Sequence, residues 1–194
     1  MTQNHSLCSD RMLVAAFMHH DDTHALNTLI CRYKDKLYTS ILLLVRDRHV
    51  ADNVFQDVFI RIIENLRKGQ YKHRSKFLPW AVRIARNLCI DHFRKVKRTP
   101  RITTSDDRDI FEALNFSEAN SDKRILTNER NVAVHKMIDM LSDEQREVVI
   151  LRHYADLSFK EIALLTKCSI NTALGRMRYA LTNLRKIMAA ANAV

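Results

Sequence analysis

The scarcity of glycine and proline is the feature of this sequence that most restricts its fold. The chain has two glycines, Gly69 and Gly175, and two prolines, Pro79 and Pro100, among 194 residues. A strand-rich fold needs turn-forming residues about every 8–12 positions, so the sequence predicts an all-α protein whose helices are joined by polar turns. A hydrophobic fraction of 46% is enough to build packed cores.

Hydrophobic periodicity predicts two helical domains joined by a flexible acidic linker. Apolar residues three and four positions apart predict the helices of a first domain, residues 1–98. These helices are expected over about 11–19, 24–45, 50–66 and 77–97. Residues 99–122 lack sustained periodicity and form the predicted linker. The second domain, 123–194, is expected to hold a helix over 123–141 and three more helices after it.

Polar residues mark the expected helix starts. Asp10 is predicted to cap the first helix, and Ser142 to cap a helix of the second domain, where Gln145 takes the place of the usual capping-box glutamate. Ser158 with Glu161 three positions on forms a complete capping box, and Ser169 is expected to cap the last helix.

Charge is unevenly distributed along the chain, which has a net charge of +10. Residues 67–101 hold twelve basic side chains and one acidic one, Asp91, for a net charge of +11. Residues 103–122 hold six carboxylates and one arginine, for a net charge of −5, and residues 152–186 have a net charge of +5. Two clustered basic regions favour a polyanionic partner such as nucleic acid over an evenly basic surface.

Several function classes find no support in the sequence. No run of about 18 apolar residues is present, so no membrane insertion is expected. The four cysteines have no zinc or redox spacing and are typical of reduced thiols in a cytoplasmic protein. The cluster of three His and two Asp at 19–24 is interpreted as a solvated turn between helices rather than a metal site. No catalytic constellation, metal site or cofactor motif is recognised, so an enzyme is not expected.

The last third of the chain is typical of a helix-turn-helix, in which the second helix enters the DNA major groove. On the last helix Ile170, Ala173, Met177, Leu184 and either Ala180 or Leu181 are expected to face the core. The opposite face holds asparagine and arginine, which contact base edges, and further bases that neutralise phosphates. A basic, solvated helical hairpin is the alternative interpretation.

The basic region 67–101 also contains aromatic residues, a combination typical of proteins that bind unpaired bases. Tyr71 lies beside Gly69 in the expected loop 67–76 and is the better candidate for stacking on a base. Phe77 and Trp80 are interpreted as core residues beneath the loop.

Two motifs resemble an extracytoplasmic-function (ECF) bacterial sigma factor of the sigma-70 family. The first resembles domain two and runs Gln56-Asp57-Val58-Phe59-Ile60-Arg61, then Ser75-x-Phe77-x-x-Trp80-x-x-x-Ile84-Ala85-x-Asn87-x-x-x-Asp91-x-x-Arg94-Lys95. The second resembles domain four and runs Leu141-Ser142-x-x-x-Arg146-x-Val148, then Leu157-Ser158-x-x-Glu161-Ile162-Ala163 and Ser169-x-x-Thr172. The resemblance covers about residues 10–98 and 123–187.

The resemblance implies a transcription initiation factor that binds core RNA polymerase and promoter DNA. It implies docking on the largest-subunit clamp helices through Asp52, Asn53, Gln56, Asp57 and Arg61, with a further contact to the flap. It implies that the minus-ten element is contacted by Tyr71, Lys72, His73, Arg74, Ser75, Lys76, Arg83, Arg86, Asn87, Asp91, Arg94 and Lys95. It implies that the minus-thirty-five element is contacted by Asn171, Thr172, Leu174, Gly175, Arg176, Arg178, Tyr179 and Lys186. Whether an anti-sigma factor binds the chain stays open.

The sequence departs from the family pattern at three places. Asp52-Asn53 stands where Glu-Asp is common, so the docking face lacks one charge. The helix-turn-helix turn has no glycine, so Lys167 or a neighbour must take any left-handed conformation there. Leu174 and Gly175 stand where basic and small polar residues are common. We hypothesise that Leu174 contacts a thymine methyl and that Gly175 lets the helix approach DNA closely.

Two other classes of function remain as alternatives on the residues alone. One is a helix-turn-helix regulator that binds operator DNA without polymerase, which leaves the polar face of helix 50–66 unexplained. The other is a nucleic-acid-processing enzyme, which needs a metal or nucleophile site that the sequence does not reveal.

Overall fold

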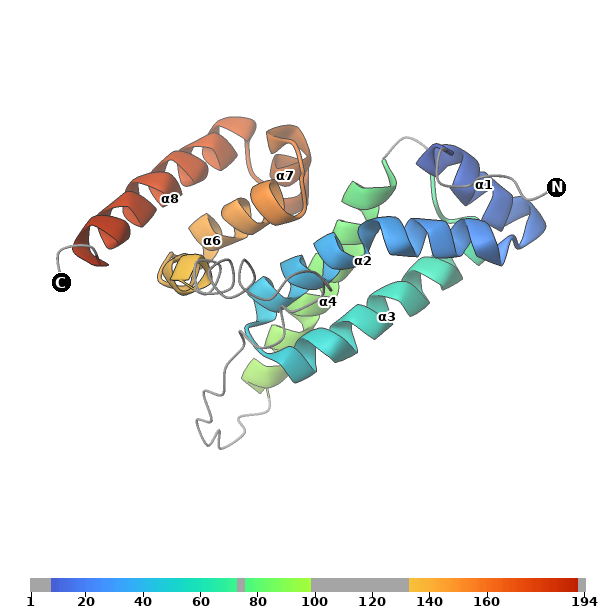
Figure 1. Cartoon of the computed structure of the whole chain (residues 1–194), viewed down its shortest axis with the longest axis horizontal. Coiled ribbons are helices and arrows are strands. Elements are labelled where there is room, and N and C mark those ends of the chain that lie inside the picture. Colours follow the sequence, from blue (N-terminus) through green and yellow to red (C-terminus); the bar gives the residue numbers. More distant parts are fainter. Residues whose placement is uncertain (1–7, 73–75, 99–132, 192–194) are drawn as a thin grey trace, which may run out of the picture. The chain divides into compact units, whose positions relative to one another are not determined.

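The computed structural model describes residues 8–72, 76–98 and 133–191, and all regular elements in these ranges are helices (Figure 1). The chain divides into two compact units, with the division between Ser105 and Asp106. We call residues 8–98 the N-terminal unit and residues 133–191 the C-terminal unit. The predicted all-α fold is confirmed. The predicted linker, 99–122, and the first part of the helix expected at 123–141 lie outside the described residues.

The N-terminal unit is a bundle of four helices. They are α1 (Asp10–His20), α2 (Thr23–Val45), α3 (Arg48–Arg67) and α4 (Phe77–Arg98). The long helix α2 packs against the other three, and α3 packs against α4 (Figure 1). Each helix begins and ends within about two residues of its predicted bounds, because an apolar stripe with helical spacing supplies each buried face.

Side-chain caps fix the starts of three of these helices. Ser9, not Asp10, caps α1 by accepting a hydrogen bond from the Met12 amide, so the prediction for Asp10 is wrong. Asp22 accepts from the His24 and Ala25 amides at the start of α2. The turn between the two helices is therefore 21–22, shorter than the 19–24 predicted, because His19, His20, Thr23 and His24 belong to the helices. Asp47 accepts from the Val50 amide at the start of α3.

The core of the N-terminal unit is made of large aliphatic and aromatic side chains. Val54, Val58, Ile62 and Leu66 line the inner face of α3 at steps of four, and the opposite face of α3 is left to solvent. The core-facing stripe of α4 ends at Cys89, because Phe93 is 41% exposed. Phe93, one turn beyond Cys89, therefore lies outside the core.

Two tyrosines of α2 donate their hydroxyl protons to carboxylates on neighbouring helices. The Tyr33 hydroxyl donates to Asp10 Oδ2 over 2.6 Å, and the Tyr38 hydroxyl donates to Asp52 Oδ1 over 2.7 Å. Burial, followed by the hydrogen bond to Asp10, raises the pKa of Tyr33 from 10.0 to about 12. Burial, followed by the hydrogen bond to Asp52, raises the pKa of Tyr38 to about 12 as well.

Raising the pH from 10 to 12 should therefore destabilise the N-terminal unit. In this range the unfolded chain loses tyrosine protons that the folded chain keeps, so the free energy of unfolding falls as the pH rises. The stabilisation is fully present below pH 10. Tyr33→Phe and Tyr38→Phe should each flatten this dependence, measured by urea unfolding at several pH values with the fluorescence of Trp80. A double variant as steep as the wild type would contradict the assignment.

The C-terminal unit is built around its last helix. A helix over 133–139 is followed by α6 (Asp143–Val149), a π-helical turn (Ile150–Tyr154), α7 (Phe159–Thr166) and α8 (Ile170–Ala191). Helix α8 packs against α6 and α7 through Ala173, Met177 and Ala180 (Figure 1). Ile170 and Leu181 are 45% and 40% exposed, so Ile170 does not face the core as predicted and Ala180 is the buried member of its pair.

The start of α6 differs from the prediction. Ser142 precedes α6 but makes no side-chain capping hydrogen bond. Gln145 does not complete a capping box, because its side-chain oxygen accepts a hydrogen bond from Asn183 Nδ2 of α8 over 2.9 Å. A tertiary contact between α6 and α8 has replaced the local one. Among the described residues, no helix is both long and apolar enough to cross a membrane.

Candidate nucleic-acid interface

The turn between α7 and α8 is fixed by local hydrogen bonds. At the start of α7 the capping box predicted from Ser158 and Glu161 is formed, with Glu161 Oε2 accepting from the Ser158 amide over 2.7 Å. Lys167 ends α7 with φ 55°, which confirms that it takes the left-handed conformation where glycine is common. Ser169 Oγ accepts from the Thr172 amide over 3.0 Å and so caps α8 as predicted. These bonds fix the end of α7 at Thr166 and the start of α8 at Ile170.

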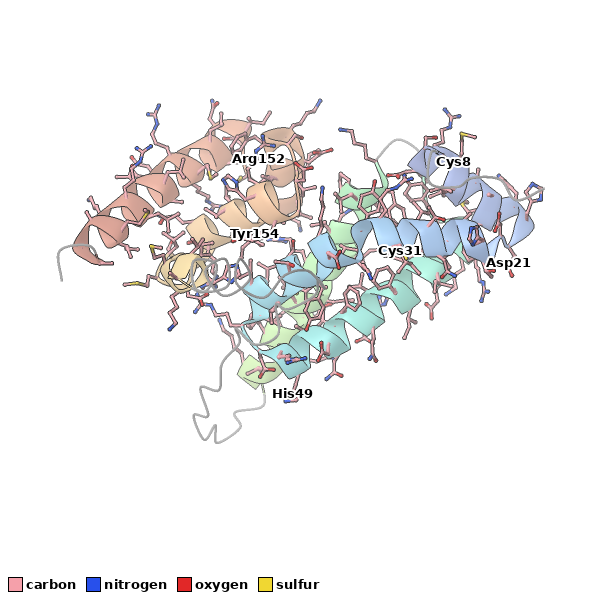
Figure 2. All side chains as sticks on the ribbon, viewed as in Figure 1. Cys8, Asp21, Cys31, His49, Arg152 and Tyr154 are labelled. Carbon is pink, nitrogen blue, oxygen red and sulfur yellow. The ribbon has the colours of Figure 1, made fainter. Side chains whose placement is uncertain are left out.

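Arg152 supports the other end of α7. Its Nη1 donates to the Leu157 carbonyl oxygen over 2.8 Å, and its guanidinium carbon lies 5.4 Å from the centre of the Phe159 ring (Arg152 is labelled in Figure 2). The sequence showed Arg152 only as one more basic residue. Its two contacts, with Leu157 and Phe159, lie just beyond Asp156, which adopts φ 57°. Arg152 therefore stabilises the turn that precedes α7.

The outer face of α8 carries the residues predicted to read DNA. Its buried residues, Ala173, Met177 and Ala180, define the opposite face. The exposed members of the predicted set are Asn171, Thr172, Leu174, Arg178, Tyr179 and Lys186, while Gly175 and Arg176 are half-buried. Side chains along the outer edge of α8 project away from α6 and α7 (Figure 2). The helix thus presents a polar and basic face interrupted by Leu174, which is 44% exposed.

Gly175 has no structural reason to be glycine within this chain. A Cβ atom added there would meet nothing within 4 Å, and its φ is not positive. Glycine inside a helix costs about 0.5–1 kcal/mol relative to alanine. No contact within the chain explains why α8 accepts this loss of stability at Gly175. The observation agrees with the hypothesis that Gly175 lets the backbone of α8 approach DNA closely.

A second basic face lies along α4. Arg83, Asn87, Asp91, Arg94 and Lys95 recur at helical spacing and are all exposed, whereas Arg86 is half-buried. Arg94 Nη1 lies 3.5 Å from Asp91 Oδ1, an exposed pair of little energetic weight. Lys72 and Lys76 are exposed at the ends of the preceding loop. His73, Arg74 and Ser75 were also predicted to contact DNA and lie outside the described residues.

The aromatic residues beside this face correct one prediction. Tyr71 is only 6% exposed, and its ring centre lies 4.8 Å from that of Trp80 and 6.4 Å from that of Phe77. Its ring therefore cannot stack on a base without moving, contrary to its choice as the better stacking candidate. Phe77 is 1% exposed, which confirms its interpretation as a core residue, and Trp80 is half-buried.

A third face lies on α3. Asn53, Gln56, Asp57 and Arg61, all predicted to dock on polymerase, are exposed on the side opposite the core. Asp52 is half-buried and accepts the hydrogen bond from Tyr38, so its carboxylate also joins α2 to α3. Ile60 is 55% exposed on the same side. Ile60 lies three and four positions after Asp57 and Gln56 and was not among the residues predicted to dock.

Comparisons with known proteins identify two family matches along the chain. The family described as Sigma-70 region 2 matches residues 29–99, and the family described as Sigma-70, region 4 matches residues 131–183. The first match contains α3 and α4, and the second contains α7 and the greater part of α8.

Curated relatives cover most of the chain. It is 30% identical over 161 residues to the RNA polymerase sigma-H factor of Pseudomonas aeruginosa, which covers 80% of this chain and 82% of the relative. It is 29% identical over 163 residues to the ECF RNA polymerase sigma-E factor of Escherichia coli, with the same two shares. It is 25% identical over 169 residues to the ECF RNA polymerase sigma factor SigW of Bacillus subtilis, with shares of 85% and 89%.

Solved structures share the fold. CnrH, in complex with the cytosolic domain of CnrY, matches with a TM-score of 0.66 and 22% identity over 93% of this chain and 97% of that chain. The sigma factor RpoE of Bartonella quintana, in complex with the anti-sigma factor NepR, matches with a TM-score of 0.62 and 18% identity over 84% and 96%. Together with the two regional matches and the curated relatives, this places the chain in the sigma-70 family of RNA polymerase sigma factors, among the ECF sigma factors.

Proposed function

We propose that this sigma factor divides promoter recognition and polymerase docking among the three faces described above. The outer face of α8 binds the upstream minus-thirty-five duplex. The exposed face of α4 and the adjoining loop bind the minus-ten element and hold an unpaired base of the non-template strand. The exposed face of α3 docks on the clamp helices of the largest polymerase subunit, and the C-terminal unit contacts the flap.

The presence of two separate basic helical faces carries this proposal. A stand-alone regulator needs only the helix-turn-helix, and it leaves α4 and α3 without a role. Trapping an unpaired base stabilises melted DNA, so the chain promotes initiation without hydrolysing a nucleotide and acts as a factor rather than as an enzyme. Basic side chains that neutralise phosphates make such binding steeply dependent on salt. The proposal places the protein in the cytoplasm, where core polymerase and promoters are found.

The two solved relatives also suggest a partner. CnrH is in complex with the cytosolic domain of CnrY, and RpoE is in complex with the anti-sigma factor NepR. We include an anti-sigma factor among the proposed partners of this chain. A complex that forms with such a protein and blocks assembly with core polymerase would support this part of the proposal.

Transcription in vitro tests the function directly. Purified core polymerase is supplied with genomic fragments, including the region upstream of this gene, with and without the protein. Specific starts that depend on the protein support the proposal and supply the promoter sequence. The absence of starts and of a stable complex with cognate core polymerase, together with tight binding of the free protein to DNA, would favour the stand-alone regulator.

Leu174 should contribute to the minus-thirty-five preference. An exposed leucine on a groove-reading helix can contact the methyl group of thymine, whereas arginine prefers the acceptors of guanine. Leu174→Arg should therefore shift the preferred base at one or two positions of a randomised promoter library by about 1–3 kcal/mol per position. Leu164→Arg changes a leucine that is 74% exposed on α7 and serves as the control. An unchanged preference in Leu174→Arg would disprove the contact.

A further inference from the structure

The two ends of the loop between α3 and α4 are held together by aromatic rings. Tyr71 and Phe77 are both buried, with ring centres 6.4 Å apart, and Trp80 lies 4.8 Å from Tyr71 and 5.7 Å from Phe77. We call Tyr71, Phe77 and Trp80 the aromatic clamp. Lys72, which follows Tyr71, and Lys76, which precedes Phe77, are therefore both anchored beside the aromatic clamp. The position of the clamp decides where Lys72 and Lys76 begin and end the loop.

A side-chain network from α1 and α2 reaches the aromatic clamp. The ring of Tyr33 lies 5.6 Å from that of Phe77, tilted by 31°. The Tyr33 hydroxyl donates to Asp10 Oδ2 over 2.6 Å, and Arg32 Nη1 donates to Asp10 Oδ1 over the same distance. Arg32 Nη2 also donates to the Cys8 carbonyl oxygen over 3.0 Å. Asp10 thus uses both carboxylate oxygens to fix two neighbouring side chains of α2.

The charge of Asp10 also acts on the aromatic clamp. Burial raises the pKa of Tyr71, and the negative charge of Asp10 raises it further. The structural path from Asp10 to the clamp runs through Tyr33, whose hydroxyl donates to Asp10 and whose ring packs against Phe77. Close-packed interiors transmit small displacements, because neighbouring rings leave no free space to absorb them.

We propose that Asp10 is a positioning residue for base capture, acting through Tyr33 and Phe77 on Lys72 and Lys76, the described residues at the two ends of the loop. This inference rests on the proposed function of the loop and the α4 face. Holding a base requires the surrounding groups to be placed accurately, and small errors of position are costly. Asp10 itself makes no contact with DNA in this scheme. Its loss releases the Tyr33 hydroxyl and lets the Tyr33 ring shift against Phe77.

The chain contains a matched pair with which to test this proposal. Tyr38 also lies on α2, and its hydroxyl donates to a carboxylate, Asp52, over 2.7 Å. Its ring packs against Phe55 of α3, with centres 5.3 Å apart, rather than against the aromatic clamp. Tyr38→Phe therefore removes the same kind of hydrogen bond from the same helix without disturbing the loop ends. It controls for a general loss of stability.

The experiment uses holoenzyme assembled with core polymerase and DNA in which the minus-ten segment is unpaired. Each of the four bases is placed in turn at the captured position, and the ratio of the strongest to the weakest affinity gives the base discrimination. Asp10→Ala, Tyr33→Phe, their double variant and Tyr38→Phe are compared with the wild type. Thermal unfolding of each free variant is measured in parallel.

The proposal predicts a loss of discrimination in one pair only. Asp10→Ala and Tyr33→Phe should lower base discrimination by about tenfold, because small errors in the position of the groups around a bound base are costly. The double variant should be no worse than Asp10→Ala, because the two residues act in one network. Tyr38→Phe should lower the unfolding temperature by a similar amount while its discrimination stays at the wild-type value.

Two other outcomes would overturn the proposal and are distinguishable. If Asp10→Ala and Tyr33→Phe lower only the unfolding temperature and keep full discrimination, then Asp10 merely anchors α1 to α2. If the wild-type holoenzyme itself does not discriminate among the four bases, the proposed role of the loop fails, and the inference fails with it.

Discussion

Replacing Phe77 with alanine should destabilise the N-terminal unit by about 3–5 kcal/mol. Phe77 is 1% exposed and is surrounded by Tyr33, Tyr71 and Trp80, with ring centres 5.6, 6.4 and 5.7 Å away. These rings come from α2, from the end of the loop and from α4 itself. They cannot all close on the space that the phenyl group leaves, so a cavity adds to the lost burial. A change of this size is a large fraction of the stability of a small domain.

Trp80 provides the measurement for this prediction. It is the only tryptophan in the chain and lies beside Phe77, so its fluorescence reports unfolding of the N-terminal unit alone. Urea titrations of the wild type and of Phe77→Ala give the difference in free energy. Phe93→Ala makes the same substitution in the same helix at a position that is 41% exposed, and it should cost less than about 1 kcal/mol. Equal losses in the two variants would show that Phe77 is not a core residue.

Local patterns in the sequence predicted the helices well. The predicted helix over 24–45 is α2, Thr23–Val45, and the predicted capping box of Ser158 and Glu161 is formed. Both features depend on residues within one or two helical turns of each other. The left-handed conformation of Lys167 was predictable for the same reason, because a tight turn without glycine leaves few candidates.

The predictions that failed involve partners distant in sequence. Asp10 was assigned to a local cap, but its carboxylate contacts Arg32 and Tyr33 of α2. Gln145 was assigned to the capping box of α6, but Asn183 of α8 donates to its side chain. In each case a polar side chain suited to a local bond is hydrogen-bonded instead to a helix distant in the sequence. A single sequence does not show which segments will meet.

Tyr71 illustrates the same limit at the candidate site. Its place beside Gly69 in a basic loop suggested an exposed ring, and hydrophobic periodicity is of no help outside a helix. Tyr71 is buried against Trp80 and Phe77 because the two ends of the loop lie together, and the sequence alone does not show that they do. The exposed faces of α3, α4 and α8 were accessible to prediction because helical spacing separates each of them from a buried stripe.

Replacing Asp57 with lysine should prevent assembly with core polymerase. Asp57 is exposed near the middle of the α3 face, beside Asn53, Gln56 and Ile60. If this face docks on the clamp helices, the reversal removes an attractive charge and places a like charge against the partner's basic groups. Such a change costs several kcal/mol at a protein interface, which corresponds to at least about a 30-fold loss of affinity. Transcription should fall at every promoter to the same extent, because docking precedes the reading of the promoter.

Asp35→Lys is the matched control, since it makes the same charge reversal at an exposed position of α2 in the same unit. Titration of labelled core polymerase with each variant gives the affinities, and transcription from two promoters of different minus-ten sequence gives the second measurement. Asp35→Lys should bind and transcribe like the wild type. Equal losses in the two variants would point to a general effect of net charge. Losses in Asp57→Lys that differ between the promoters would place Asp57 in DNA reading rather than in docking, and the α3 face would then need another partner.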